Sequence, residues 1–220
     1  MVDAAIGGKT GINLLAGKNL VGAFHSPRAV IIDEGFLASL SDRDVKAGMA
    51  EVAKCGFIAD SAILDLIENG WKEKIGELIY RAVAVKAKIV SEDFRESFAR
   101  EVLNYGHTLG HAIEKHSGYS LRHGEAVSIG LVFAAEISVR FAGLSDSDLA
   151  RHYRVLSAIG LPTAYQASAW PELLDLMQYD KKRDSSGVRF VGLKAMGVTL
   201  RLQDLDTKEL ESIYLSKIGR

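Results

Sequence analysis

The feature that most constrains this chain is the stretch from Arg100 to His123, REVLNYGHTLGHAIEKHSGYSLRH, which holds four of the six histidines in the sequence. His107 and His111 are four residues apart, so on a helix both rings lie on one face, one turn apart. His123 follows a glycine-containing turn and begins a second apolar helix, which can return a third imidazole to the same place. Isolated polar groups are costly to bury, so this cluster predicts a site for a metal or ligand.

The residues before this cluster extend the pattern. Arg100 and Asn104 precede His107 by seven and three residues, so one continuous helix would place them on the face that carries the histidines. The other histidines are expected to be structural: His25 in a loop, His116 at an exposed helix end and His152 on an exposed helix face.

Charge and cysteine content exclude several classes of function. The formal net charge of −1 argues against bulk attraction to nucleic acid or an anionic membrane. The single cysteine, Cys55, excludes an internal disulfide and fits the reducing cytoplasm. The start of the chain lacks the pattern of a signal peptide, and the apolar run around IGLVFAAEI is too short to span a bilayer. We therefore expect a cytoplasmic protein.

The first forty residues predict little regular structure. Residues 1–23 are rich in glycine around Lys9 and Lys18, which suggests backbone brought close to an anion, with a flexible connector as the alternative. GGKT is not a phosphate-binding P-loop, because Asp3 stands where that motif needs glycine. AVIID, residues 29–33, predicts one buried strand. A complete nucleotide-binding α/β half needs several strands, so the chain is expected to begin within a domain.

The remainder is expected to be mainly helical. Ser41 or Asp42 can cap a helix over 42–59. On it Glu51 and Lys54 are three residues apart, and their small apolar neighbours favour a partly buried pair facing a site over an exposed ion pair. Further helices are expected over 61–90, 125–142, 146–160, 170–183 and 207–219, with a β-hairpin near 188–202. The predicted organisation is an α/β remnant, 1–40, and a multi-helix domain, 41–220.

The residue types predict metal chemistry on a small anion. Catalytic zinc sites combine imidazole and carboxylate, and the best set is Glu51 with two or three of His107, His111 and His123. HTLGH lacks the glutamate of a metalloprotease H-E-x-x-H motif. Cations suited to a polyanion occur along the chain: Lys9, Lys18, Lys54, Lys86, Arg100, Lys181 and Lys182. The residues alone therefore indicate a metal-dependent enzyme acting on a small anionic, hydroxylated substrate.

Five motifs together resemble a known family. GGKTGIN, GKNLVGAFHSP, GMAEVAKCG, REVLNYGHTLGHAIE and RHGEAVSIG resemble, in order and spacing, the 3-dehydroquinate synthases, from residue 1 to about residue 195. The resemblance implies a shikimate-pathway lyase that converts 3-deoxy-D-arabino-heptulosonate 7-phosphate to 3-dehydroquinate and phosphate. It also implies NAD as a recycled cofactor and a divalent metal, zinc or cobalt.

The resemblance assigns roles to individual residues. The implied metal ligands are Glu51, His107 and His123, with His111 near the substrate phosphate. Lys54 and Asp3 match groups near the substrate hydroxyls and metal, and Lys86 and Arg100 match those that hold the carboxylate. The implied phosphate pocket contains Asn19, Asn104, Lys9 and Lys181. Lys9 and Lys18, with the turn Phe36, Leu37, Ala38 and Ser39, match NAD contacts.

Several alternatives remain open at this level. Other sugar-phosphate cyclases, such as 2-deoxy-scyllo-inosose and 2-epi-5-epi-valiolone synthases, share fold, NAD and metal but act on substrates without the carboxylate. Metal-dependent polyol dehydrogenases are more distant. Most of the family's N-terminal NAD-binding domain has no counterpart here, so a further alternative is a chain that binds metal but does not catalyse turnover alone. We expect a homodimer, or association with a missing N-terminal half.

Overall fold

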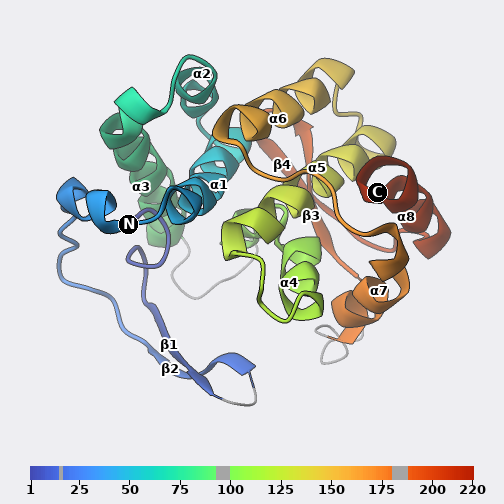
Figure 1. The fold of residues 1–220 in the computed structure, drawn as a ribbon, viewed down its shortest axis with the longest axis horizontal. Coiled ribbons are helices and arrows are strands. Elements are labelled where there is room, and N and C mark those ends of the chain that lie inside the picture. Colours follow the sequence, from blue (N-terminus) through green and yellow to red (C-terminus); the bar gives the residue numbers. More distant parts are fainter. Residues whose placement is uncertain (15–16, 93–99, 180–187) are drawn as a thin grey trace.

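The computed structural model describes residues 1–14, 17–92, 100–179 and 188–220 and is mainly helical, as predicted (Figure 1). A body of packed helices surrounds α5, and a hairpin at the N-terminal end projects away from it. Within the described residues, no helix has both the length and the apolar character needed to cross a membrane.

The projecting hairpin consists of β1, Lys9–Leu14, and β2, Gly17–Phe24, paired antiparallel with Lys9 opposite Phe24. Its glycines obscured the alternation that would have predicted it. The strand predicted at 29–33 is wrong, since this segment has no regular structure and the Ile31 side chain is 93% exposed. A short apolar run forms a strand only when another strand takes up its backbone hydrogen bonds. The predicted turn that follows is a 3-10 helix, η1, Glu34–Ser39.

The predicted helix over 42–59 is α1, Asp42–Ile58. Its cap is Ser41, whose hydroxyl accepts a hydrogen bond from the Asp44 amide. The second half of α1, from Met49 onward, is buried, which places Glu51 and Lys54 in the interior. The helical region predicted at 61–90 divides into α2, Ala62–Glu68, the 3-10 turn η2, Lys72–Lys74, and α3, Ile75–Glu92.

The spacing predicted one continuous helix through the histidine-rich stretch, and this prediction is wrong. The stretch comprises a 3-10 turn, η3, Arg100–Asn104, and then α4, His107–His116. Gly106 separates them with φ of 79°, a left-handed conformation that favours glycine. Arg100 and Asn104 therefore do not continue the histidine face of α4, which begins only at His107.

The central helix is α5, His123–Ala142, which contacts α1, α4, α6 and β3. Two glycines allow this packing. A Cβ at Gly124 would lie 1.8 Å from the carbonyl oxygen of Ala47 on α1, and a Cβ at Gly130 would lie 1.9 Å from that of Gly106. The N-terminal half of α5 is thus in direct backbone contact with the segments that carry Glu51 and His107.

The C-terminal half follows the predicted order. It contains α6, Asp146–Ile159, ended by Gly160 with φ of 84°, the turn η4, Ala167–Ala169, and α7, Trp170–Tyr179. The predicted hairpin is β3, Phe190–Ala195, paired antiparallel with β4, Val198–Leu202. The closing helix is α8, Thr207–Ile213, continued by a π-helical turn, η5, Tyr214–Ile218.

Candidate metal centre

Three potential metal ligands converge from three helices. The Glu51 Oε1 atom of α1 lies 3.3 Å from the His107 Nε2 atom of α4 and 3.1 Å from the His123 Nε2 atom of α5. The ligand atoms of this set all lie within 4.8 Å of one another. One carboxylate and two imidazoles form a donor set suited to zinc, which leaves a further coordination position for a substrate or water.

The carboxylate of this set is charged despite its burial. Glu51 and Lys54 form an ion pair at 2.5 Å, with side chains 7% and 3% exposed, so the pair that was predicted to be partly buried is buried. Burial opposes the charge of Glu51, but Lys54 and the two histidines hold its pKa well below the usual value. Burial likewise opposes the charge of Lys54, but Glu51 and then Asp3 raise its pKa. The Lys54 ammonium lies against Glu51 Oε2, whereas Glu51 Oε1 faces the two imidazoles, so Oε1 is the oxygen placed to bind a metal.

Each imidazole is oriented through its other nitrogen. His107 Nδ1 lies 3.1 Å from the Tyr105 carbonyl oxygen, and because a carbonyl only accepts, Nδ1 carries a proton and Nε2, which faces Glu51 Oε1, is the nitrogen placed to bind a cation. His123 Nδ1 lies 3.0 Å from Glu114 Oε2, while its Nε2 faces Glu51. Burial opposes protonation of His123, but Glu114 and Glu51 together raise its pKa to about 9. A metal ion would displace that proton from Nε2.

Glu114 is a site residue that the sequence analysis missed. It follows His107 by seven residues and His111 by three, a spacing that places all three on one face of α4 and that could have identified it. The His111 ring lies 5.2 Å from the His107 ring and 6.0 Å from the His123 ring. His111, Glu114 and His123 form a second possible ligand set, which shares His123 with the first.

A second group of predicted residues lies together near the start of the chain. Lys86 on α3 is buried, donates to the backbone carbonyl of Asp3 and forms an ion pair with the Asp3 carboxylate at 2.7 Å. Arg100 is also buried, and a Cβ at Gly7 would lie 3.3 Å from its guanidinium. The segment around Asp3 and Gly7 therefore brings Asp3, Lys86 and Arg100 together, and Lys86 already pairs with a carboxylate there.

The other predicted site residues are more scattered. Asn104 is exposed at the end of η3, and Lys9 is exposed on β1. Phe36, Ala38 and Ser39 of η1 are exposed and Leu37 is half-buried. Lys18 and Asn19 lie on β2 with side chains outside the described part, and Lys181 and Lys182 lie outside the described residues.

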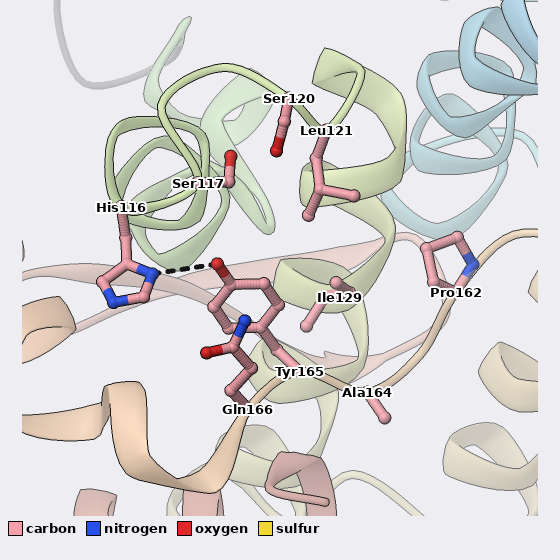
Figure 2. A pocket seen from close by; sticks show the side chains of 9 residues that line it. All are labelled: His116, Ser117, Ser120, Leu121, Ile129, Pro162, Ala164, Tyr165 and Gln166. Atoms are coloured by element: carbon pink, nitrogen blue, oxygen red, sulfur yellow. Dashed lines mark hydrogen bonds between the residues drawn. The ribbon is translucent and has the colours of Figure 1, made fainter.

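A separate cavity lies beyond the end of α4 (Figure 2). Its volume is about 430 Å³, and among the predicted site residues whose side chains the structure describes, none lines it. The His116 Nδ1 atom lies 2.9 Å from the Tyr165 hydroxyl, so His116 ends a helix as predicted but is partly buried and hydrogen-bonded there. The lining residues are His116, Ser117, Ser120, Leu121, Ile129, Pro162, Ala164, Tyr165 and Gln166.

Comparison with known proteins identifies the family. Residues 48–183 match the model described as 3-dehydroquinate synthase C-terminal, and residues 1–47 match 3-dehydroquinate synthase N-terminal. The chain belongs to the 3-dehydroquinate synthase family. It is 52% identical over 228 residues to the 3-dehydroquinate synthase of Nocardia farcinica and 53% identical to that of Rhodococcus erythropolis. Both matches cover 100% of this chain and 61% of the relative, so the chain spans under two thirds of these synthases.

Two solved structures of sugar-phosphate cyclases share the fold. A 2-epi-5-epi-valiolone synthase from Streptomyces hygroscopicus, with NAD⁺ and Zn²⁺ bound, matches 98% of this chain and 62% of its own with a TM-score of 0.87 and 26% identity. A 2-deoxy-scyllo-inosose synthase complexed with carbaglucose-6-phosphate, NAD⁺ and Co²⁺ matches 97% of this chain and 63% of its own, with a TM-score of 0.80 and 27% identity. The observed helical fold is therefore that of the C-terminal part of this family.

Proposed function

We propose that this chain forms the metal- and substrate-binding part of a 3-dehydroquinate synthase. The reaction converts 3-deoxy-D-arabino-heptulosonate 7-phosphate to 3-dehydroquinate and phosphate. The observation that carries the proposal is the convergence of Glu51, His107 and His123 beside a buried Lys54. The whole enzyme's activity is proposed for the longer protein that the relatives represent, since the chain spans 61% of their length.

The donor set fits a divalent metal ion, with zinc or cobalt as the proposed occupant. The three ligand atoms come from separate helices, the carboxylate is charged, and the other nitrogen of each imidazole has a partner that fixes its orientation. An ion held there would supply Lewis-acid polarisation of a substrate hydroxyl. The chain's own contribution is to hold the three ligands at fixed positions and to place the Lys54 ammonium at the same carboxylate.

Lys86 and Arg100 are proposed to hold the substrate carboxylate. Both are buried cations, and Lys86 already pairs with the carboxylate of Asp3. An arginine binds carboxylates through two parallel hydrogen bonds, and a lysine adds a point charge. Asp3 and Lys54 are proposed to lie at the substrate hydroxyls. The proposed phosphate pocket comprises His111, Asn104, Lys9, Asn19 and Lys181.

The cofactor NAD would supply a hydride acceptor and return the hydride later in the cycle. The proposed contacts from this chain are Lys9, Lys18, Phe36, Leu37, Ala38 and Ser39. The described members of this set lie on exposed segments, with Leu37 half-buried. We further propose a homodimer in the cytoplasm, in keeping with the buried, unpaired Cys55 and the exposed apolar side chains of the β1–β2 hairpin.

Another sugar-phosphate cyclase activity is the second candidate, because the two solved structures are such enzymes. Lys86 and Arg100, two buried cations that both lie against the segment around Asp3 and Gly7, favour a substrate that carries a carboxylate. Exchanging the heptulosonate for a sugar phosphate without a carboxylate, in the protein restored to the relatives' length, tests this choice. If the protein turned over the sugar phosphate without a carboxylate and did not turn over the heptulosonate, the dehydroquinate synthase proposal would be contradicted.

The metal site is tested by calorimetric titration of the chain with zinc and NAD, separately and together. We expect zinc to bind at one site, His107→Ala or Glu51→Ala to abolish binding, and His111→Ala to leave it intact. Equal loss of zinc from all three variants would show that the ligands are assigned wrongly. Failure of the wild-type chain to bind zinc at all would contradict the proposed metal site.

A further inference from the structure

His152 is buried, whereas the sequence analysis placed it on an exposed helix face. Its side chain on α6 is 0% exposed and stacks on the Phe57 ring, with centroids 3.8 Å apart and planes inclined by 11°. Burial lowers the pKa of His152 to about 4, so its imidazole is neutral at physiological pH. It does not belong to the metal ligand set, but it is hydrogen-bonded to Tyr105, whose carbonyl oxygen contacts the ligand His107.

The hydrogen bonds of His152 fix which nitrogen carries its proton. Nδ1 lies 2.8 Å from the Asp148 carbonyl oxygen, which can only accept, so Nδ1 donates. Nε2 of the neutral ring is then an acceptor, and it lies 2.9 Å from the hydroxyl of Tyr105. The Tyr105 hydroxyl therefore donates to His152, and the fully buried Tyr105 ring is fixed at its outer end.

The backbone of Tyr105 connects this pair to the metal centre. Its carbonyl oxygen accepts the hydrogen bond from His107 Nδ1, at 3.1 Å. Between them stands Gly106, whose carbonyl oxygen is in contact with Gly130 of α5, where a Cβ would lie only 1.9 Å away. The connection from the Tyr105 side chain to the His107 ring therefore passes through closely packed backbone with little room to adjust.

A neutral pair of this kind adds little net stability compared with an apolar pair of the same shape. Its distinctive effect is directional, because a hydrogen bond fixes an orientation that apolar packing leaves open. We propose that the Tyr105–His152 pair is a positioning device that holds the Tyr105 carbonyl where it orients His107 Nε2 toward the metal. Neither residue touches the metal or substrate, and the inference rests on the proposed role of His107 as a ligand.

The test uses three variants of the 220-residue chain: Tyr105→Phe, His152→Phe and the double variant. Each single variant leaves one buried polar group without its partner, whereas the double variant leaves neither and should recover most of the lost thermal stability. The control is Tyr214→Phe, because Tyr214 is also fully buried and donates to a backbone carbonyl, that of Gln166, at 2.7 Å.

Two readouts separate the positioning role from a merely structural one. In the metal-free chain, ¹⁵N NMR of the imidazoles reports the tautomer of His107, and zinc competition against a chromophoric chelator reports affinity. In Tyr105→Phe and in the double variant, we expect both His107 tautomers to be populated. We also expect zinc affinity to fall about tenfold, the lower end of the losses seen when a residue hydrogen-bonded to a metal ligand is changed. Tyr214→Phe should lower the melting temperature without changing either readout.

The inference is overturned if the double variant keeps the wild-type His107 tautomer, or if it binds zinc as tightly as the wild type. Either result would mean that the pair only fills the core. Should Tyr105→Phe fail to fold, the double variant still decides, since it buries no unpartnered polar group. The tautomer readout needs no metal, so absence of zinc binding by the wild-type chain would contradict the proposed function while the positioning role is judged separately.

Discussion

Replacing Gly124 by alanine would test whether the contact between α1 and α5 sets the geometry of the metal centre. Gly124 follows the ligand His123 directly, and a Cβ there would lie 1.8 Å from the carbonyl oxygen of Ala47. Cβ atoms in proteins stay more than 3.0 Å from atoms to which they are not bonded, so the two helices must separate by at least about 1.2 Å at this point. The obstructing atoms are backbone and cannot rotate away. The bidentate contact of Arg43 on α1 with Glu125 on α5, at 2.6 and 2.7 Å, resists the movement.

The expected effect on the site follows from this displacement. Glu51 stands one helical turn after Ala47, so its carboxylate, now 3.1 Å from His123 Nε2, would move with α1. Metal ligands must lie within about 0.2 Å of their proper distances, and a functional group tolerates roughly 0.5 Å. A separation of about 1.2 Å exceeds both, so we expect zinc affinity to fall about 100-fold or more. Overpacking should also cost about 1–3 kcal/mol of stability.

The assay is zinc competition against a chromophoric chelator, with urea unfolding of the same samples. Gly48→Ala is the matched control, since Gly48 is exposed on the same helix and a Cβ there meets nothing within 4 Å. It should stabilise α1 by up to about 1 kcal/mol and leave zinc binding unchanged. Zinc binding by Gly124→Ala within about twofold of the wild type would show that the helix contact does not set the ligand geometry.

Three further predictions concern charges at the site. Glu114→Gln should weaken zinc binding about tenfold, because the amide still accepts from His123 Nδ1 but loses the charge; unchanged affinity would contradict its orienting role. The pKa of His123 is raised from 6.5 to about 9, so the protonated ring stabilises the metal-free chain. This contribution to stability is complete below pH 6.5 and is lost as the pH rises through 9. The melting temperature of the metal-free chain should therefore decrease as the pH rises from 6.5 to 9, and it should decrease less in His123→Asn. Glu51→Gln removes the carboxylate that is ion-paired with the buried Lys54 and should lower the free energy of unfolding in urea by about 3 kcal/mol, which adding Lys54→Met should largely restore.

Local sequence patterns predicted most of the helical fold correctly. The Ser41 cap, the end of α6 at Gly160 and the β3–β4 hairpin each depend on residues near one another in the chain, so short-range rules identify them. The strand predicted at 29–33 failed because a strand depends on a partner that the local pattern does not specify. The β1–β2 hairpin was missed for a related reason, since its glycines give no alternating signal.

The sequence by itself determined the chemistry of the candidate centre: imidazoles, a carboxylate and cations at helical spacings, in motifs of one family. Only the tertiary structure decided which nitrogen of each imidazole faces Glu51, because the Tyr105 carbonyl and Glu114 hold the other nitrogens. It also decided that His152 is buried. The physical reason is that spacing fixes only the face of a helix on which a residue lies. The neighbours of that face, and the direction of each ring, depend on close contacts between helices distant in sequence.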